Sequence, residues 1–193
     1  MQPESGSPDA GVTRYATPRR IALAEYERMV ELGFFENERV ELIRGVIVRM
    51  SPQGPLHSSP LEKLTSLLVL ALVGRAKVRC QMPLRGPGDS MPEPDLAIVP
   101  HADYRARHPS AAHLVIEISD SSREYDRETK APLYAELGVP ELWLVDVRKQ
   151  TVEVRTDPDD GIYRRVETLA VGQSIAPRAF PDVSVAVAAI FEA

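Results

Sequence analysis

Pro94-Asp95-Leu96-Ala97-Ile98-Val99 opens the part of the sequence, Met91 to Tyr134, from which the fold is predicted. An acidic residue stands here at the head of an apolar run, and the next apolar segment, His113-Leu114-Val115-Ile116-Glu117-Ile118-Ser119, also carries a carboxylate. A third segment, Asp126-Arg127-Glu128-Thr129-Lys130, opens a predicted helix. Burying two carboxylates on adjacent apolar strands costs free energy unless a cation compensates for the lost hydration. We therefore interpret the remaining sequence as a scaffold for this cluster.

The length and composition predict one ordinary globular domain. The chain has 193 residues, of which 44% are hydrophobic and 26% charged, which is enough for an independent core. Residues 1–15 are rich in Gly, Ser, Pro and Asp, and we expect a disordered tail followed by a single domain over residues 16–193. The net charge of −5 argues against a protein that coats duplex nucleic acid through its overall field.

The sequence also indicates a cellular location. The longest apolar run, Leu67 to Val73, is too short to cross a bilayer, and the N-terminus lacks the order of a signal peptide. A single cysteine, Cys80, excludes an intramolecular disulfide and a multi-cysteine zinc site. We expect a cytoplasmic protein without membrane contact.

The order of the predicted elements indicates an α/β fold with a mixed central sheet flanked by helices. An N-terminal helix and a hairpin form an extension before this core. The Arg44-Gly45 pair is typical of a hairpin turn. The predicted elements are helix 18–32, hairpin 40–50, helix 58–72, strand 77–84, the strands that carry Asp95 and Glu117, helix 126–137, and strands 141–147, 151–155 and 163–169.

Asp95 and Glu117 are predicted to lie side by side if their strands pair antiparallel, because side chains alternate between the faces of a strand. Repulsion would then raise the pKa of one carboxyl group, and a hard divalent cation such as Mg²⁺ or Mn²⁺ would remove the conflict. Lys130 shares a helical face with Leu133 and Leu137, which places its ammonium over the same sheet. Pro132 is a misfit, because the helix must start later than predicted or be kinked there. A satisfied ion-pair network is the alternative to a catalytic site.

Glu41 interrupts an otherwise apolar strand of the hairpin. We interpret it as a surface residue on the polar face of the hairpin. The alternative is a third acidic group near the cluster.

The sequence resembles the PD-(D/E)xK nucleases, because Pro94-Asp95 is followed by Glu117-Ile118-Ser119, although Ser119 stands where these enzymes carry a lysine. Within that superfamily the chain resembles the Uma (Uma-two) family of endonucleases. The matching phrases are Glu38-Arg39-Val40-Glu41-Leu42-Ile43-Arg44-Gly45, Met50-Ser51-Pro52, His57, Pro92-Glu93-Pro94-Asp95-Leu96-Ala97, Glu117-Ile118-Ser119-Asp120-Ser121-Ser122, Tyr125-Asp126, Lys130-Ala131-Pro132-Leu133-Tyr134-Ala135 and Gly138-Val139-Pro140-Glu141-Leu142-Trp143.

This resemblance implies a restriction-endonuclease-like core of three layers and hydrolysis of DNA phosphodiester bonds with Mg²⁺ or Mn²⁺. It implies that Asp95, Glu117 and the backbone carbonyl of Ile118 bind the metal. Lys130 takes the role of the missing lysine, and Glu41 and His57 lie near the site as accessory groups.

Two further expectations concern activity and assembly. The alternative to an endonuclease is a catalytically weak or inactive nuclease-fold domain with a nucleic-acid-binding or regulatory role, which Ser119 and the acidic net charge favour. The apolar segment Val183 to Phe191 is predicted to pack onto a sheet edge or a partner subunit, with a homodimer as the expected assembly.

Overall fold

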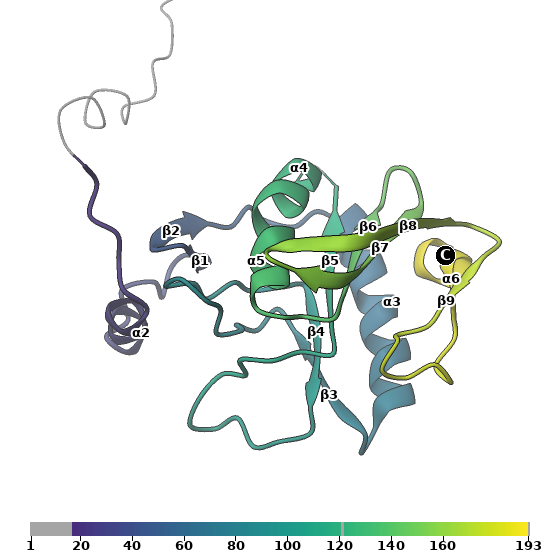
Figure 1. The fold of residues 1–193 in the computed structure, drawn as a ribbon, viewed down its shortest axis with the longest axis horizontal. Helices are drawn as coiled ribbons and strands as arrows, with labels where there is room; N and C mark the ends of the chain where they lie inside the picture. The colour runs from purple at the N-terminus through teal and green to yellow at the C-terminus, as the bar shows by residue number, and fades with distance from the viewer. Residues whose placement is uncertain (1–16, 121, 193) are drawn as a thin grey trace, which may run out of the picture.

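The fold is built around a six-stranded mixed sheet (Figure 1). The computed structural model describes residues 17–120 and 122–192, and the predicted disordered tail lies outside these ranges. The strands, in their order across the sheet, are β3 (Ala76–Cys80), β4 (Leu96–Pro100), β5 (Leu114–Ser119), β6 (Glu141–Asp146), β7 (Thr151–Asp159) and β8 (Ile162–Ala170). β5 and β6 run parallel, whereas the other neighbouring pairs run antiparallel. The predicted α/β class with a mixed sheet is confirmed.

Helices cover both faces of the sheet and give the three layers. The long helix α3 (Pro55–Leu72) buries leucines at intervals of three and four residues, which is the spacing of one helical face. These leucines pack with Leu96, Ile98 and Ile116 on one face of the sheet. The alternate residues of β4 and β5, such as Ala97, point to the other face and pack against helix α5 (Ala131–Glu136).

The N-terminal extension forms a separate small core beside the sheet (Figure 1). It consists of helix α2 (Leu23–Glu31) and the hairpin of β1 (Val40–Ile43) with β2 (Val46–Arg49). The predicted helix over residues 18–32 begins too early, because Ala22 is extended, the helix starts only at Leu23, and the Ile21 amide donates to the Gly45 carbonyl at 2.9 Å.

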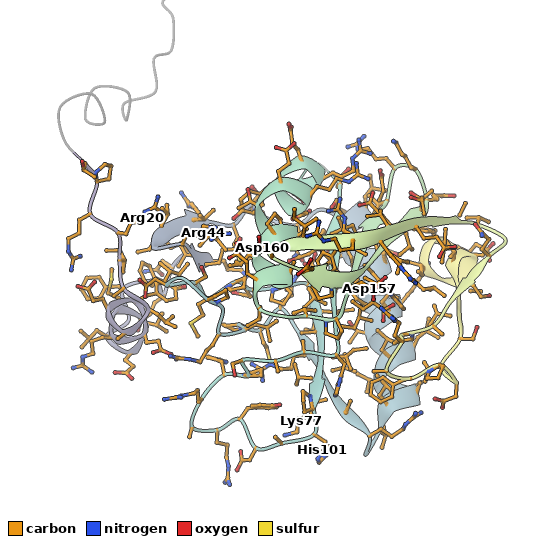
Figure 2. All side chains as sticks on the ribbon, in the orientation of Figure 1. Arg20, Arg44, Lys77, His101, Asp157 and Asp160 are labelled. Carbon is orange, nitrogen blue, oxygen red and sulfur yellow. The ribbon has the colours of Figure 1, made fainter. Side chains whose placement is uncertain are left out.

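The hairpin turn has the predicted form. Arg44 and Gly45 have φ values of 50° and 75°, and two consecutive positive values are typical of a type I′ turn. Arg20 lies beside Arg44 (Figure 2), and its guanidinium donates to the Arg44 carbonyl at 2.5 Å. The extended N-terminal segment therefore holds the turn that orients β1.

A π-helical segment resolves the misfit at Pro132. Helix α4 (Arg123–Tyr125) leads into η1 (Asp126–Lys130), which continues directly into α5. The Ala131 amide donates to the Asp126 carbonyl, five residues back, so the helix is locally wider. Proline lacks an amide hydrogen and clashes with the carbonyl four residues earlier in a regular helix. The helix therefore starts earlier than predicted and changes its hydrogen-bond pattern immediately before Pro132.

The C-terminal segment packs against the hydrophobic core of its own chain. It comprises β9 (Ser174–Ile175), β10 (Val185–Ala186) and α6 (Val187–Phe191). Val183, Val187 and Ile190 are buried in the same core as the leucines of α3. The homodimer was predicted because these apolar residues were expected to need a partner subunit. Their burial within one chain removes that argument, and the homodimer stays a prediction. Across the described residues, no helix combines the length and the apolar character needed to cross a membrane.

Candidate active site

Asp95 and Glu117 lie next to each other at one end of the β4–β5 pair. The register pairs Leu96 with Ile116 in antiparallel strands, which sets Asp95 opposite Glu117. The Asp95 amide donates to Glu117 Oε2 at 3.3 Å, and the Ile118 amide donates to Asp95 Oδ2 at 2.8 Å. Asp95 and Glu117 keep only 7% and 2% of their accessible surface. The predicted neighbouring pair of buried carboxylates is therefore present.

Lys130 reaches this pair from the helix that covers the sheet. Its ammonium Nζ lies 3.1 Å from Glu117 Oε1 and 3.3 Å from Glu41 Oε2, and the residue is 5% exposed. Tyr134, one helical turn further on, donates its hydroxyl to Glu117 Oε1 at 2.5 Å. Lys130 and Tyr134 thus both bind the same carboxylate oxygen, which fixes the orientation of Glu117.

Glu41 is buried, so its interpretation as a surface residue is wrong. It is 2% exposed, and all four residues of β1 are buried. Both faces of β1 are covered, so neither is left for solvent. The Glu93 amide donates to Glu41 Oε2 at 3.1 Å, and the Tyr125 hydroxyl donates to Oε1 at 3.2 Å. Glu41 is therefore a third carboxylate beside Lys130.

His57 and two glutamines surround Asp95. His57 lies in the first turn of α3, and its Nε2 atom is 3.0 Å from Asp95 Oδ2. The Nδ1 atom of the same ring is buried without a hydrogen-bond partner among the described residues. Gln53 and Gln81 donate their side-chain amides to Asp95 Oδ1 at 3.3 and 3.4 Å. Neither glutamine was predicted from the sequence, and no sequence pattern marks the positive φ of 50° at Gln81.

Ser119 occupies the position where the superfamily carries a lysine. Its hydroxyl donates to Asp126 Oδ2 at 2.6 Å, and the Ser122 hydroxyl donates to the same oxygen at 2.8 Å. Asp126 is buried in the π-helical segment, one turn before Lys130. The space next to the strand therefore holds a fourth carboxylate with its own hydroxyl donors.

The raised pKa values of the cluster show that one ammonium does not compensate all of its carboxyl groups. Burial raises the pKa of Glu117 to about 8, although Lys130 opposes this shift. Burial also raises the pKa of Asp126 above its usual value. Burial alone would lower the pKa of Lys130, but Glu117 and Glu41 outweigh it and keep the pKa raised, so Lys130 is charged. Several buried carboxylates thus share one ammonium, an arrangement that a further cation would stabilise.

A cavity of about 420 Å³ opens over this cluster. The loop from Met50 to Gly54 forms one wall, and Ser122, Tyr125 and Asp126 form another. Asp95, Glu117, Lys130, Glu41 and His57 all line it, as does Ile118, so the structure brings together every site residue predicted from the sequence.

The donor set of the cavity suits a hard cation. Among the described residues, no group of three or more His, Cys, Asp and Glu side chains is arranged to hold a metal ion. Mg²⁺ does not need such a group, because it is usually held by one or two carboxylates together with waters and substrate phosphates. Oxygen atoms of Asp95 and Glu117 at the base of an open cavity fit this requirement.

Comparisons with known proteins identify the family and the fold of the chain. The family described as "Uma2: Putative restriction endonuclease" matches residues 23–188. A crystal structure described as "a putative nuclease belonging to DUF820" from Anabaena variabilis superposes with a TM-score of 0.71 at 20% sequence identity, covering 89% of this chain and 97% of the other. At this level of identity the likeness shows the fold alone. No curated protein matches the sequence.

Proposed function

The chain belongs to the Uma2 family of restriction-endonuclease-like proteins, and from this premise we propose that it is an endonuclease that hydrolyses DNA phosphodiester bonds with Mg²⁺ or Mn²⁺. The observation that carries the proposal is the buried Asp95–Glu117 pair with Lys130 at 3.1 Å from Glu117. A structural ion pair would need one carboxylate for one lysine. The excess of carboxylates at the base of an open cavity favours a site that takes up a cation and a phosphate.

Asp95, Glu117 and the backbone carbonyl of Ile118 are the proposed ligands. A divalent ion bound there would polarise the scissile phosphate and lower the pKa of a bound water. His57 and the Ile118 amide both contact Asp95 Oδ2, so they hold the carboxylate in one orientation and leave Oδ1 with two weak amide donors. We assign His57 to the positioning of Asp95.

Lys130 is the proposed catalytic cation. Its ammonium would orient the attacking water or stabilise negative charge that develops on the phosphoryl oxygens. Glu41 and Glu117 hold the ammonium from two sides, and Tyr134 fixes Glu117. Glu41 therefore acts through Lys130 as an accessory residue. Because Lys130 is anchored on the helix and not on the strand, Ser119 does not need to be a lysine.

Plasmid nicking with Mg²⁺ or Mn²⁺ tests the proposal. We expect wild-type protein to convert supercoiled plasmid to the nicked form, and Lys130→Ala and Asp95→Ala to lose this activity. Lys149→Ala is the matched control, because it removes an exposed lysine outside the cavity. Full activity in either site variant would refute the assignment of that residue.

A nuclease-fold domain that binds nucleic acid without cleaving it is the second candidate. Ser119, bonded to Asp126 in place of a strand lysine, favours it. Titration calorimetry with Mg²⁺ separates the two functions, because this candidate predicts no metal binding and unchanged nucleic-acid binding in Glu117→Gln.

A homodimer would suit cleavage of both strands of a duplex, and a monomer mass from light scattering would contradict that assembly.

A further inference from the structure

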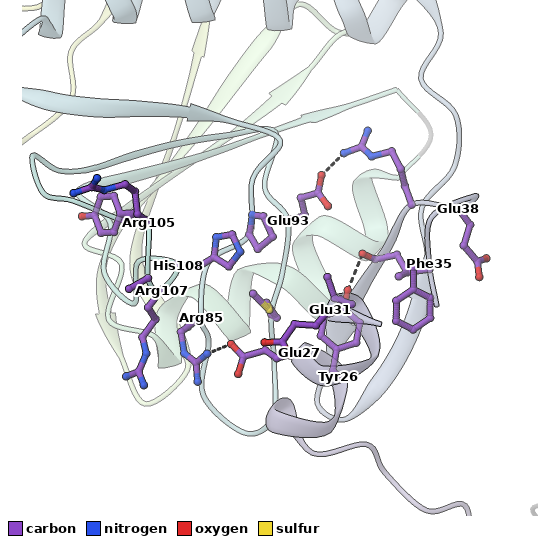
Figure 3. Close-up of a pocket in the computed structure, with 17 residues that line it drawn as sticks. Tyr26, Glu27, Glu31, Phe35, Glu38, Arg85, Glu93, Arg105, Arg107 and His108 are labelled. Carbon is purple, nitrogen blue, oxygen red and sulfur yellow. Dashed lines mark hydrogen bonds and ion pairs between the residues drawn. The ribbon is translucent and has the colours of Figure 1, made fainter. Parts of the chain in front are cut away.

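A second pocket lies beside the candidate active site, between α2 and the loop of residues 101–109 (Figure 3). We call it the flanking pocket, and its volume is about 630 Å³, which is within the range of ligand sites. Val40 and Glu41 are consecutive in β1 and point to opposite sides, so Val40 lines the flanking pocket while Glu41 lines the catalytic cavity. Glu93 lines both. A DNA strand that passed from the catalytic cavity over Glu93 would therefore reach the flanking pocket.

The two walls of the flanking pocket differ in chemistry (Figure 3). The wall formed by α2 and the turn after it carries carboxylates and aromatic rings, and its one cation, Arg39, is paired with Glu93. The opposite wall, formed by Arg85 and the loop, carries the other cations together with Tyr104. The acidic and aromatic wall includes Tyr26, Glu27, Glu31, Phe35 and Glu38. The basic wall includes Arg85, Arg105 and Arg107. A ligand that spans the pocket thus meets cations at one end and aromatic and acceptor groups at the other.

Arg107 is the cation of this pocket that is available to an anion. Arg85 is paired with Glu27 across the pocket, and Arg105 with Asp103 at 2.6 Å within its own loop. Arg107 is exposed and has no acidic partner among the described residues. A phosphate group at this end of the pocket would therefore not have to displace an existing ion pair.

The aromatic surfaces are held in place before any ligand binds. The rings of Tyr26 and Phe35 stack at 5.6 Å with an interplanar angle of 29°. Tyr104, on the opposite wall, donates its hydroxyl to the Pro100 carbonyl at 2.8 Å, and the guanidinium of Arg79 lies 5.6 Å from its ring centroid. Every base has a π face, so stacking on such a ring favours binding of a base whatever its identity.

We propose that the flanking pocket binds an unpaired nucleotide next to the scissile phosphate, with Arg107 on a phosphate and the aromatic wall against the base. This inference rests on the proposed nuclease function. A base inside a duplex is stacked on both sides and paired at its edge, so it cannot enter the pocket. An unpaired base can stack on Phe35 of the aromatic wall and donate its exocyclic amino group to a glutamate of the same wall. The substrate class is therefore single-stranded DNA, or duplex DNA with unpaired nucleotides at the cleavage site.

Fluorescence anisotropy without divalent metal tests the binding, since cleavage is then prevented. We expect wild-type protein to bind a labelled single-stranded oligonucleotide more tightly than a fully paired hairpin of the same composition. Arg107→Glu should weaken single-strand binding about tenfold, because it reverses the charge that contacts the phosphate. Arg164→Glu is the matched control, an exposed arginine on β8 that lies outside the flanking pocket, and it should leave the affinity unchanged. Equal weakening by the two variants would overturn the proposal, as would equal affinity for the two oligonucleotides.

Two further measurements locate the bound base and separate this inference from the proposed function. Ultraviolet cross-linking of a thiothymidine oligonucleotide should label residues 26–38 or 101–109, and labelling confined to other segments would overturn the inference. Hydrolysis of bis(p-nitrophenyl) phosphate, a diester without bases, tests the catalytic cavity alone. Its failure would refute the hydrolytic function, whereas the anisotropy and cross-linking results would still decide whether the flanking pocket binds an unpaired nucleotide.

Discussion

The ammonium of Lys130 lies 3.1 Å from Oε1 of Glu117, although the two residues belong to different layers of the fold. Glu117 lies on a central strand, and Lys130 ends the π-helical segment that crosses above it. Their contact depends on the wider helical turn before Pro132, which sets the direction of the helix. The ion pair and the three-layer packing are therefore coupled, and disturbing one should destabilise the other.

We expect Lys130→Met to lower the free energy of unfolding by about 3–5 kcal/mol at pH 9, above the pKa of Glu117, because it leaves ionised buried carboxylates without their cation. Urea unfolding measures this loss. The double variant Lys130→Met with Glu117→Gln should recover part of it, since the amide carries no charge. Equal losses in the single and double variants would show that Lys130 acts through packing alone.

The pH dependence of stability should follow Glu117. Its pKa is raised from 4.5 to about 8 in the folded protein, so the folded state holds a proton that the unfolded state has released. Without metal, the free energy of unfolding should therefore fall as pH rises from 4.5 to about 8, by up to about 1.4 kcal/mol for each pH unit.

Unfolding experiments in urea at a series of pH values measure this slope. Glu117→Gln should flatten it, because the amide does not titrate, while Glu167→Gln on the exposed face of β8 should keep it. A slope that is the same in wild type and Glu117→Gln would assign the pH dependence to other groups. Asp126, whose pKa is also raised, is the first of these to examine.

The sequence was sufficient to predict the parts of the site that depend on periodicity. The positions of Asp95 and Glu117 follow from alternation along strands, and that of Lys130 from its spacing to Leu133. The predicted direction of the Lys130 side chain is correct although residues 126–130 are π-helical. The π-helical segment ends at Lys130, so the α-helical spacing applies from Lys130 onward. The same patterns explain why the mixed sheet and its two covering helices were predicted.

The burial of Glu41 and the contacts of Gln53 and Gln81 could not be predicted in this way. Each depends on how a loop or the hairpin extension lies against the sheet, and that placement involves residues far apart in the sequence. Glu41 meets Lys130 across the hairpin extension, and Gln81 reaches Asp95 after the end of β3. Local patterns carry no information on these contacts, and a single acidic residue in a strand usually faces solvent.

The hairpin turn that orients Glu41 should tolerate no side chain at Gly45. Gly45 has φ of +75°, and an added Cβ would lie 2.7 Å from Arg20 Cβ. Gly74→Ala is the matched control, because Gly74 has φ of +73° with no atom within 4 Å of an added Cβ. We expect Gly74→Ala to cost about 1–2 kcal/mol and Gly45→Ala to cost more. Similar melting temperatures for the two variants would mean that the Arg20 side chain moves away from the added methyl group at little cost in free energy.

The last prediction concerns the cation itself. At neutral pH, Mg²⁺ or Mn²⁺ should raise the melting temperature, because an ion that binds the folded state alone stabilises it by about 2.7 kcal/mol at a hundredfold excess over Kd. The rise should be much smaller at pH 4, where carboxyl groups with raised pKa values take up protons instead. It should also be smaller in Asp95→Asn, which removes one proposed ligand charge. Asp160→Asn is the control, because it changes an exposed turn residue with φ of 47° that asparagine also accepts. Equal rises in wild type and Asp95→Asn would mean that the cation binds elsewhere and that the Asp95–Glu117 pair is purely structural.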